Sequence, residues 1–113
     1  MIRELSKING LDYQVTIIGT GPAGLSLALS LSKKNIKVLL LEAGDFGYTN
    51  QSQEVYDGSI IGPYPSITST RLRFFGGTSN HWAGYCRPLD EVDFESFPIN
   101  KSDLDPYLDE ASS

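Results

Sequence analysis

A run of six residues, Gly19-Thr20-Gly21-Pro22-Ala23-Gly24, constrains the fold of this 113-residue chain more than any other feature. The pattern Gly-x-Gly-x-x-Gly is common in proteins, so its meaning depends on the segments that flank it. The residues before it, Tyr13 to Ile18, are rich in β-branched and aromatic side chains. That composition predicts a strand that ends at the first glycine.

The residues after the first glycines are predicted to form a helix from Pro22 to Lys34, although part of their pattern favours a strand. Apolar and polar residues alternate from Leu25 to Ser32, as in a half-buried strand. Three features outweigh this alternation: a proline suits the first helical turn, leucine, alanine and serine are not β-branched, and two lysines followed by Asn35 suit a helix C-terminus. Lys37 to Leu41 then predicts a strand buried on both faces of a parallel sheet.

Each glycine of the hexamer has its own role in such a strand-helix-strand unit. Gly19 allows a tight exit from the strand, Gly21 lets a pyrophosphate approach the backbone, and Gly24 allows close contact between helix and sheet. Because Pro22 has no N–H group, we expect the amides of Ala23 and Gly24, with the positive end of the helix, to hold the anion. The predicted fold class is α/β, a Rossmann-type FAD/NAD(P)-binding βαβ unit with an incomplete parallel sheet.

An acidic residue follows the second predicted strand at the spacing that this unit requires. Glu42 lies 18 residues after Gly24, where a carboxylate can accept both hydroxyls of an adenosine ribose. Its negative charge disfavours the 2′-phosphate of NADP. NAD and FAD both place an ADP moiety here, so these residues alone do not separate the two cofactors.

A second glycine-containing segment, Gly76-Gly77-Thr78-Ser79-Asn80-His81-Trp82, is more specific than the hexamer. Together with the hexamer, Leu41-Glu42-Ala43-Gly44 and Arg87-Pro88-Leu89-Asp90, it resembles the glucose-methanol-choline (GMC) family of FAD-dependent oxidoreductases. The resemblance is strongest to the branch of pyranose oxidase-like and sugar dehydrogenase-like flavoproteins. It extends from about residue 12 through Asp103-Leu104-Asp105-Pro106-Tyr107-Leu108.

The GMC resemblance implies that the second segment runs along the flavin and its pyrophosphate. Adjacent glycines let backbone amides approach the cofactor, and short polar side chains can hydrogen-bond the flavin ring. The cofactor contacts implied in this way come from Gly76, Gly77, Thr78, Ser79, Asn80 and His81. In some relatives of the pyranose oxidase type, the histidine that matches His81 is bonded covalently to the flavin, so covalent attachment is a hypothesis here.

Outside these motifs the sequence predicts little regular structure before a final helix. Residues 44–70 combine glycines, prolines and scattered polar residues, which favours a long loop, and Arg71 and Arg73 suit phosphate contacts and surface positions equally. Ser102 followed by Asp105 predicts a capping box and a helix that begins near Ser102. We expect an N-terminal lead (1–11), the dinucleotide-binding unit (12–44), a flavin-contacting loop region (45–101) and the start of a truncated helix (102–113).

The resemblance also implies what this chain lacks. The catalytic base of GMC enzymes is a histidine far toward the carboxyl end of a longer chain, which would place it beyond Ser113, and no histidine follows His81 here. We therefore expect the N-terminal FAD-binding fragment of an enzyme that oxidises CH–OH groups of an alcohol, sugar or polyol by hydride transfer to FAD, with the fragment alone inactive. The alternatives are a non-catalytic nucleotide-binding module or truncated product, and a fragment of an NAD-dependent Rossmann dehydrogenase.

Composition argues against several other classes of protein. One cysteine and one histidine are too few for a metal cluster of these residues, so no metal site is predicted. The net charge of −5 argues against nucleic-acid binding. No apolar run approaches the roughly 20 residues of a membrane helix, and no signal-peptide pattern is present, so a cytoplasmic location is expected. The expected partners are a small alcohol or sugar substrate and an electron acceptor that the sequence does not identify.

Overall fold

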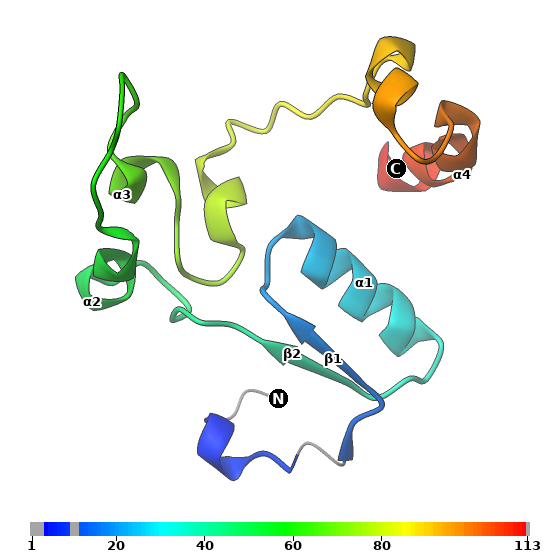
Figure 1. Cartoon of the computed structure of the whole chain (residues 1–113). Coiled ribbons are helices and arrows are strands. Elements are labelled where there is room, and N and C mark those ends of the chain that lie inside the picture. Colours follow the sequence, from blue (N-terminus) through cyan, green and yellow to red (C-terminus); the bar gives the residue numbers. More distant parts are fainter. Residues whose placement is uncertain (1–3, 10–11, 113) are drawn as a thin grey trace. The chain divides into compact units, whose positions relative to one another are not determined.

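The computed structural model describes residues 4–9 and 12–112, which form two compact units (Figure 1). The first unit runs through Trp82 and the second begins at Ala83. The helices and strands of the first unit are η1 (Leu5–Lys7), β1 (Val15–Ile18), α1 (Pro22–Lys33), β2 (Val38–Leu41), α2 (Asn50–Gln53), η3 (Glu54–Tyr56), α3 (Ile67–Thr70) and η4 (Gly77–His81), where η denotes a 3₁₀ helix. Those of the second unit are η5 (Glu91–Ser96) and α4 (Lys101–Ser112).

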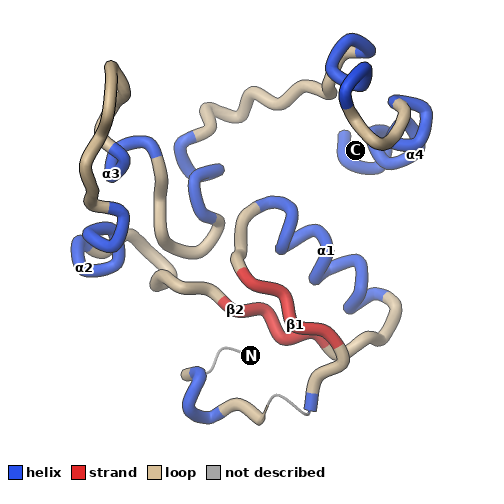
Figure 2. The backbone as a smooth tube through the Cα atoms, viewed as in Figure 1, coloured by secondary structure: helices blue, strands red, loops and turns tan. Residues whose placement is uncertain are grey.

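The first unit is built on two parallel strands joined by a helix (Figure 2). β1 and β2 pair in a register that places Val15 opposite Val38 and Ile18 opposite Leu41. A parallel pair needs a crossover connection, and α1 supplies it. The predicted α/β strand-helix-strand unit is therefore confirmed.

The ends of α1 agree with the chemistry predicted for them. Gly21 is the N-cap residue and Pro22 occupies the first helical position, where its missing N–H leaves no bond unmade. At the other end, Asn35 has a left-handed φ of 61°, and its N–H donates to the carbonyl of Ser32 over 2.9 Å. These contacts close the last turn, so the helix ends where the polar residues Lys33 to Asn35 follow the apolar segment.

The prediction that the second strand is buried on both faces is wrong for the described residues. All four residues of β2 are half-buried, and Ile18 of β1 is 84% exposed. The reason is that α1 packs on one face only, where Ile17 is 9% exposed. Because adjacent strand residues point to opposite faces, the neighbour of a buried Ile17 is left uncovered.

The prediction of a loop without regular structure over residues 44–70 is also wrong in part. Short helical turns form at α2, η3 and α3 within this stretch. Thr49 caps the first of them by accepting a hydrogen bond from the Ser52 amide over 3.2 Å. Gln53, 3% exposed, donates to the carbonyls of Thr68 and Arg71 and so ties the stretch to the residues that follow it.

The start of the final helix differs from the prediction by a small shift with a clear cause. α4 begins at Lys101, and the Asn100 amide donates to the Asp103 carboxylate over 2.9 Å. Asp105, the acid predicted to close the box with Ser102, instead accepts from the Lys101 ammonium over 2.6 Å. The capping acid is therefore the one that lies three residues after Asn100.

Both ends of the predicted organisation include residues outside the described part of the chain. The structure describes α4 through Ser112, so Ser113, the last residue of the predicted final helix, lies outside the described residues. The same holds for residues 1–3 and 10–11 of the predicted N-terminal lead. The predicted boundaries at these positions therefore stay predictions.

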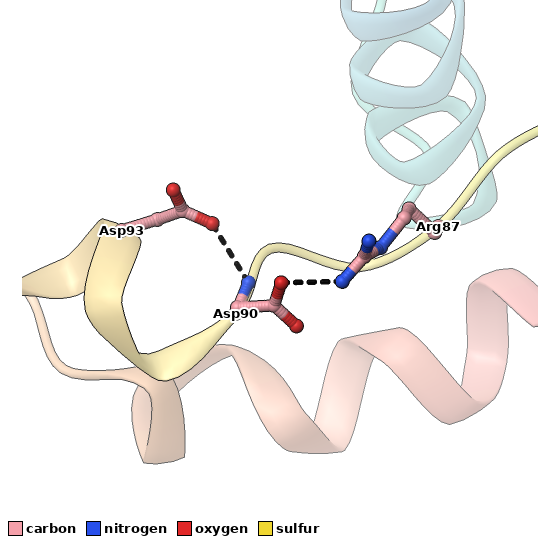
Figure 3. A network of polar contacts seen from close by, with 3 residues as sticks. All are labelled: Arg87, Asp90 and Asp93. Carbon is pink, nitrogen blue, oxygen red and sulfur yellow. Dashed lines mark hydrogen bonds and ion pairs between the residues drawn. The ribbon is translucent and has the colours of Figure 1, made fainter.

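A capping arrangement at the start of η5 was not predicted (Figure 3). The Asp93 carboxylate accepts from the Asp90 amide over 2.8 Å, and the Asp90 carboxylate pairs with the Arg87 guanidinium. The side chains of the ion pair are exposed, so the pair contributes little to stability. Its effect is local, because it fixes the turn that enters η5.

Within the described residues, no helix combines the length and the apolar character that crossing a bilayer requires.

Replacing Gly24 by alanine should destabilise the chain. A Cβ on Gly24 would lie 2.1 Å from the Gly19 carbonyl oxygen, whereas one on Gly47 would meet nothing within 4 Å. Helix propensity alone would favour alanine by about 1 kcal/mol, but the clash should reverse the sign and lower the free energy of unfolding by about 2 kcal/mol. Urea denaturation of Gly24→Ala measures this, with Gly47→Ala, expected within about 0.5 kcal/mol of wild type, as control.

Candidate functional site

A cavity of about 280 Å³ lies where β1 and β2 end. Four parts of the first unit line it: the end of β1 with the first glycines, the residues after β2, the last residue of η3, and the segment from Leu72 to the start of η4. The lining residues are Ile18, Gly19, Thr20, Gly21, Glu42, Ala43, Tyr56, Leu72, Arg73, Gly77 and Thr78. Ligands of open parallel sheets bind outside the carboxyl ends of the strands, so this cavity is the candidate site.

Glu42 is held in the wall of this cavity by four protein donors. Its Oε2 accepts from the amide of Thr20 over 3.0 Å and from the Thr20 hydroxyl over 2.5 Å. Its Oε1 accepts from the amides of Ala43 and Gly44, each over 2.9 Å. The carboxylate is thus fixed at the end of β2, facing the glycine loop.

The same donors keep Glu42 ionised. Partial burial raises the pKa of its carboxyl, but the hydrogen bonds from the Thr20 hydroxyl and from the amides of Gly44, Thr20 and Ala43 outweigh burial, so the pKa lies below its ordinary value. The site therefore presents a negative charge at neutral pH. This charge is the property that the sequence assigned to Glu42.

The first glycine loop has the backbone that its spacing predicted. Gly19 has a φ of +98°, which an L side chain rarely adopts, and Gly24 lies against the Gly19 carbonyl with no room for a Cβ. The Cβ position of Gly21 is open, with no atom within 4 Å. Pro22 and Ala23 form the first turn of α1 and lie outside the set of residues that line the cavity.

The second glycine segment reaches the cavity at its beginning. Gly76 and Gly77 have φ values of +89° and +62°, and a Cβ on Gly77 would lie 3.9 Å from the Cα of Gly21. Gly77 and Thr78 line the cavity. The two glycine motifs, far apart in the sequence, are therefore neighbours in the fold.

The remaining residues of the second segment are used to hold its turn. The Ser79 hydroxyl donates to the Gly76 carbonyl over 2.7 Å, and the Asn80 amide donates to the carbonyls of Phe75 and Gly77. His81 is exposed at the end of η4 and is not among the cavity-lining residues. The structure thus brings Gly77 and Thr78 to the first loop, and it leaves Ser79, Asn80 and His81 outside the cavity.

Sequence reasoning missed Thr20 and left Arg73 open. Thr20 occupies a variable position of the hexamer pattern, and no sequence signal marks it. Arg73 lines the cavity, and its Nη1 donates to the Ser52 hydroxyl over 3.1 Å, whereas Arg71 is exposed and outside the cavity. The two arginines that the sequence could not separate therefore differ in position.

The structure assigns no catalytic base to this site. The GMC resemblance places that base beyond Ser113, outside both the sequence and the described residues. The single histidine, His81, lies outside the cavity. The cofactor-binding roles of the described residues and the catalytic base both stay predictions.

A second cavity, of about 290 Å³, is lined by Tyr48, Asn50, Gln53, Glu54, Asp57 and Thr68. It presents two carboxylates and lacks glycine amides, so it does not suit a phosphate. Within the described residues, no group of three or more His, Cys, Asp and Glu side chains could hold a metal ion.

Comparison with known proteins bears on the class of fold. Residues 17–70 match the profile of the family described as "NAD(P)-binding Rossmann-like domain". The chain is 28% identical over 126 aligned residues to 2-methyl-1,2-propanediol dehydrogenase of Mycolicibacterium austroafricanum, a match that covers 85% of this chain and 23% of that protein. It is 35% identical over 74 residues to the flavin-containing amine oxidase A of Canis lupus familiaris, covering 62% of this chain and 14% of that protein.

The chain thus spans less than a quarter of the length of either relative, and no solved structure matches it significantly. The fold class, a partial Rossmann-like α/β unit, is confirmed, and oxidoreductases are among the proteins to which the chain is similar. They do not show membership of the GMC family or binding of FAD, and both stay predictions.

Acid should remove the contribution of Glu42 to stability. Because its folded-state pKa lies below the ordinary value of 4.5, the stabilisation is fully present above that value and is lost as pH falls through the folded-state pKa. We expect the difference in free energy of unfolding between wild type and Glu42→Gln to shrink as pH is lowered from 7 to about 3. Urea denaturation at a series of pH values measures this difference, and a constant difference would contradict the prediction.

Proposed function

We propose that this chain supplies the ADP-binding part of an FAD-dependent oxidoreductase that oxidises CH–OH groups of an alcohol, sugar or polyol. The observation that carries the proposal is the cavity lined jointly by Gly21, Glu42 and Gly77. When bound, FAD would accept a hydride from the donor carbon. The chain's own part is to hold the cofactor and set its position.

The backbone around the cavity fits a diphosphate. No atom occupies the position of a Cβ on Gly21, and a Cβ on Gly77 would have the Gly21 Cα as its nearest neighbour, so both backbones are accessible. The 12-residue helix α1 begins directly after Gly21, so the positive end of its helix dipole lies beside this glycine. A pyrophosphate would therefore meet backbone amides instead of side chains.

Charges at the cavity suit the two halves of an ADP moiety. Arg73 is one of the lining residues, with its Nη1 donating to the Ser52 hydroxyl over 3.1 Å, and we expect its positive charge to offset that of a phosphate. Glu42 places a carboxylate at the end of β2, where an adenosine ribose is expected. Gly76 to His81 would then continue along the cofactor toward the flavin, as the GMC resemblance implies.

The substrate class rests on the second glycine segment and on the diol named in one relative. A match over 85% of a 113-residue chain must include residues 76–82 wherever it begins, so the similarity to the propanediol dehydrogenase covers this segment. The match to the amine oxidase covers 62% of the chain and supports a flavin cofactor through that protein's name. CH–OH oxidation with FAD is the function that combines both.

His81 is the candidate for covalent attachment within this proposal. It is exposed, and one residue of the sequence separates it from Ser79, whose hydroxyl holds the turn of the second segment. Denaturation of the whole gene product tests the attachment, since flavin that remains with the protein supports it. Complete release of flavin would leave non-covalent binding.

A methyl group at Gly21 should weaken nucleotide binding without unfolding the chain. Gly21 has a φ of −63°, which alanine adopts readily, and its Cβ position is open. We expect Gly21→Ala to weaken ADP binding at least about ten-fold, because the methyl group occupies the place of the pyrophosphate. Calorimetric titration with ADP measures the dissociation constant, with Gly47→Ala as a matched control that should bind like wild type.

The two arginines provide an independent test of the same site. Arg73→Met should weaken ADP binding about five- to ten-fold, while Arg71→Met should leave it unchanged, because only Arg73 lines the cavity. Equal effects of the two substitutions would contradict the proposed location. Titrations with FAD and with NAD distinguish the flavin proposal from a nicotinamide-dependent dehydrogenase. The substrate class is tested separately, by measuring dye-linked oxidation of diols, sugars and amines by the whole gene product.

A further inference from the structure

We propose that Thr20 is a positioning residue: its side chain joins Glu42 to Gly76 and so holds the second glycine segment against the first. Thr20 is only 2% exposed, and it is the most buried polar residue of the described part of the chain. Its importance for cofactor binding rests on the function proposed above. The connection itself follows from the contacts of one hydroxyl.

The direction of the hydrogen bonds at Thr20 is set by charge. A hydroxyl has one proton to donate and lone pairs to accept with. An ionised carboxylate only accepts, so the Thr20 proton must point to Oε2 of Glu42, 2.5 Å away. The oxygen of the hydroxyl then accepts from the Gly76 amide over 3.0 Å. Thr20 therefore transmits the fixed position of Glu42 to the backbone of Gly76.

This connection joins segments that the sequence separates by 56 residues. It is the one hydrogen bond that the described residues form between the glycine hexamer and the segment from Gly76 to Trp82. Gly76 needs such a restraint because its φ of +89° belongs to a conformation open mainly to glycine, the residue with most freedom to lose on folding. Without the hydroxyl, the turn before η4 would lose its hydrogen bond to the glycine hexamer.

A competing role for the same hydroxyl makes the opposite prediction for nucleotide binding. Glu42 already accepts four protein donors, about the number of acceptor sites that a carboxylate offers. Three of the donors are backbone amides, so only the Thr20 hydroxyl can rotate away. If it competed with a ribose hydroxyl for Glu42, removing it would strengthen nucleotide binding, whereas removing a positioning residue should weaken binding.

The test compares Thr20→Val, which keeps the shape but removes the hydroxyl, with Thr20→Ser, which keeps the hydroxyl. Thr16→Val is a matched control at an exposed position of β1. Amide hydrogen exchange at Gly76, followed by NMR on the 113-residue chain, should become at least about five-fold faster in Thr20→Val and stay near wild type in the other two. The dissociation constant for ADP should rise about five-fold in Thr20→Val alone.

Unchanged exchange at Gly76 in a folded Thr20→Val chain would overturn the proposal, and so would tighter ADP binding. If Thr20→Val does not fold, Thr20→Cys, with a much weaker hydrogen-bonding group, takes its place, and the same increase in exchange is required. Failure of wild type to bind ADP would refute the proposed function instead. The exchange rate at Gly76 would still decide the role of Thr20, because it is measured without a ligand.

Discussion

The hydrogen bonds between Thr20 and the carboxylate of Glu42 are the contact on which the candidate site depends. Parallel pairing of β1 and β2 ends both strands at the same edge, with Ile18 opposite Leu41. The next residues of each strand, the glycine loop and Glu42, are therefore brought together by the sheet. The carboxylate then fixes the loop, and through Thr20 it fixes the second glycine segment.

The glycines of the loop differ in the space around their Cβ positions, and the difference matches their roles. Gly24 is required because α1 lies directly on the Gly19 carbonyl, which leaves no room for a methyl group. At Gly21 there is room for a methyl group, since no atom lies within 4 Å of its Cβ position. One glycine thus serves the packing of helix on sheet, and the other keeps the backbone accessible to an anion.

The fold of the first unit was predictable where local chemistry and tertiary packing agree. The alternation from Leu25 to Ser32 favours a strand, yet the segment is a helix, because Pro22 and Asn35 set its ends and α1 must cross over between parallel strands. Burial of β2 was overestimated, since a covering of both faces is a property of a larger sheet than the two strands described. Capping of α4 was misplaced because Asp105 pairs with Lys101.

The sequence by itself determined the strand-helix-strand unit, the position of Glu42 and the two glycine motifs, because spacing, helix ends and turn chemistry are local properties. Only the tertiary structure decided that Gly77 lies beside Gly21, that Arg73 and not Arg71 lines the cavity, and that Thr20 connects Glu42 to Gly76. The physical reason is that a hydrogen bond between residues 56 positions apart depends on how the chain returns to the sheet. No local pattern encodes that return.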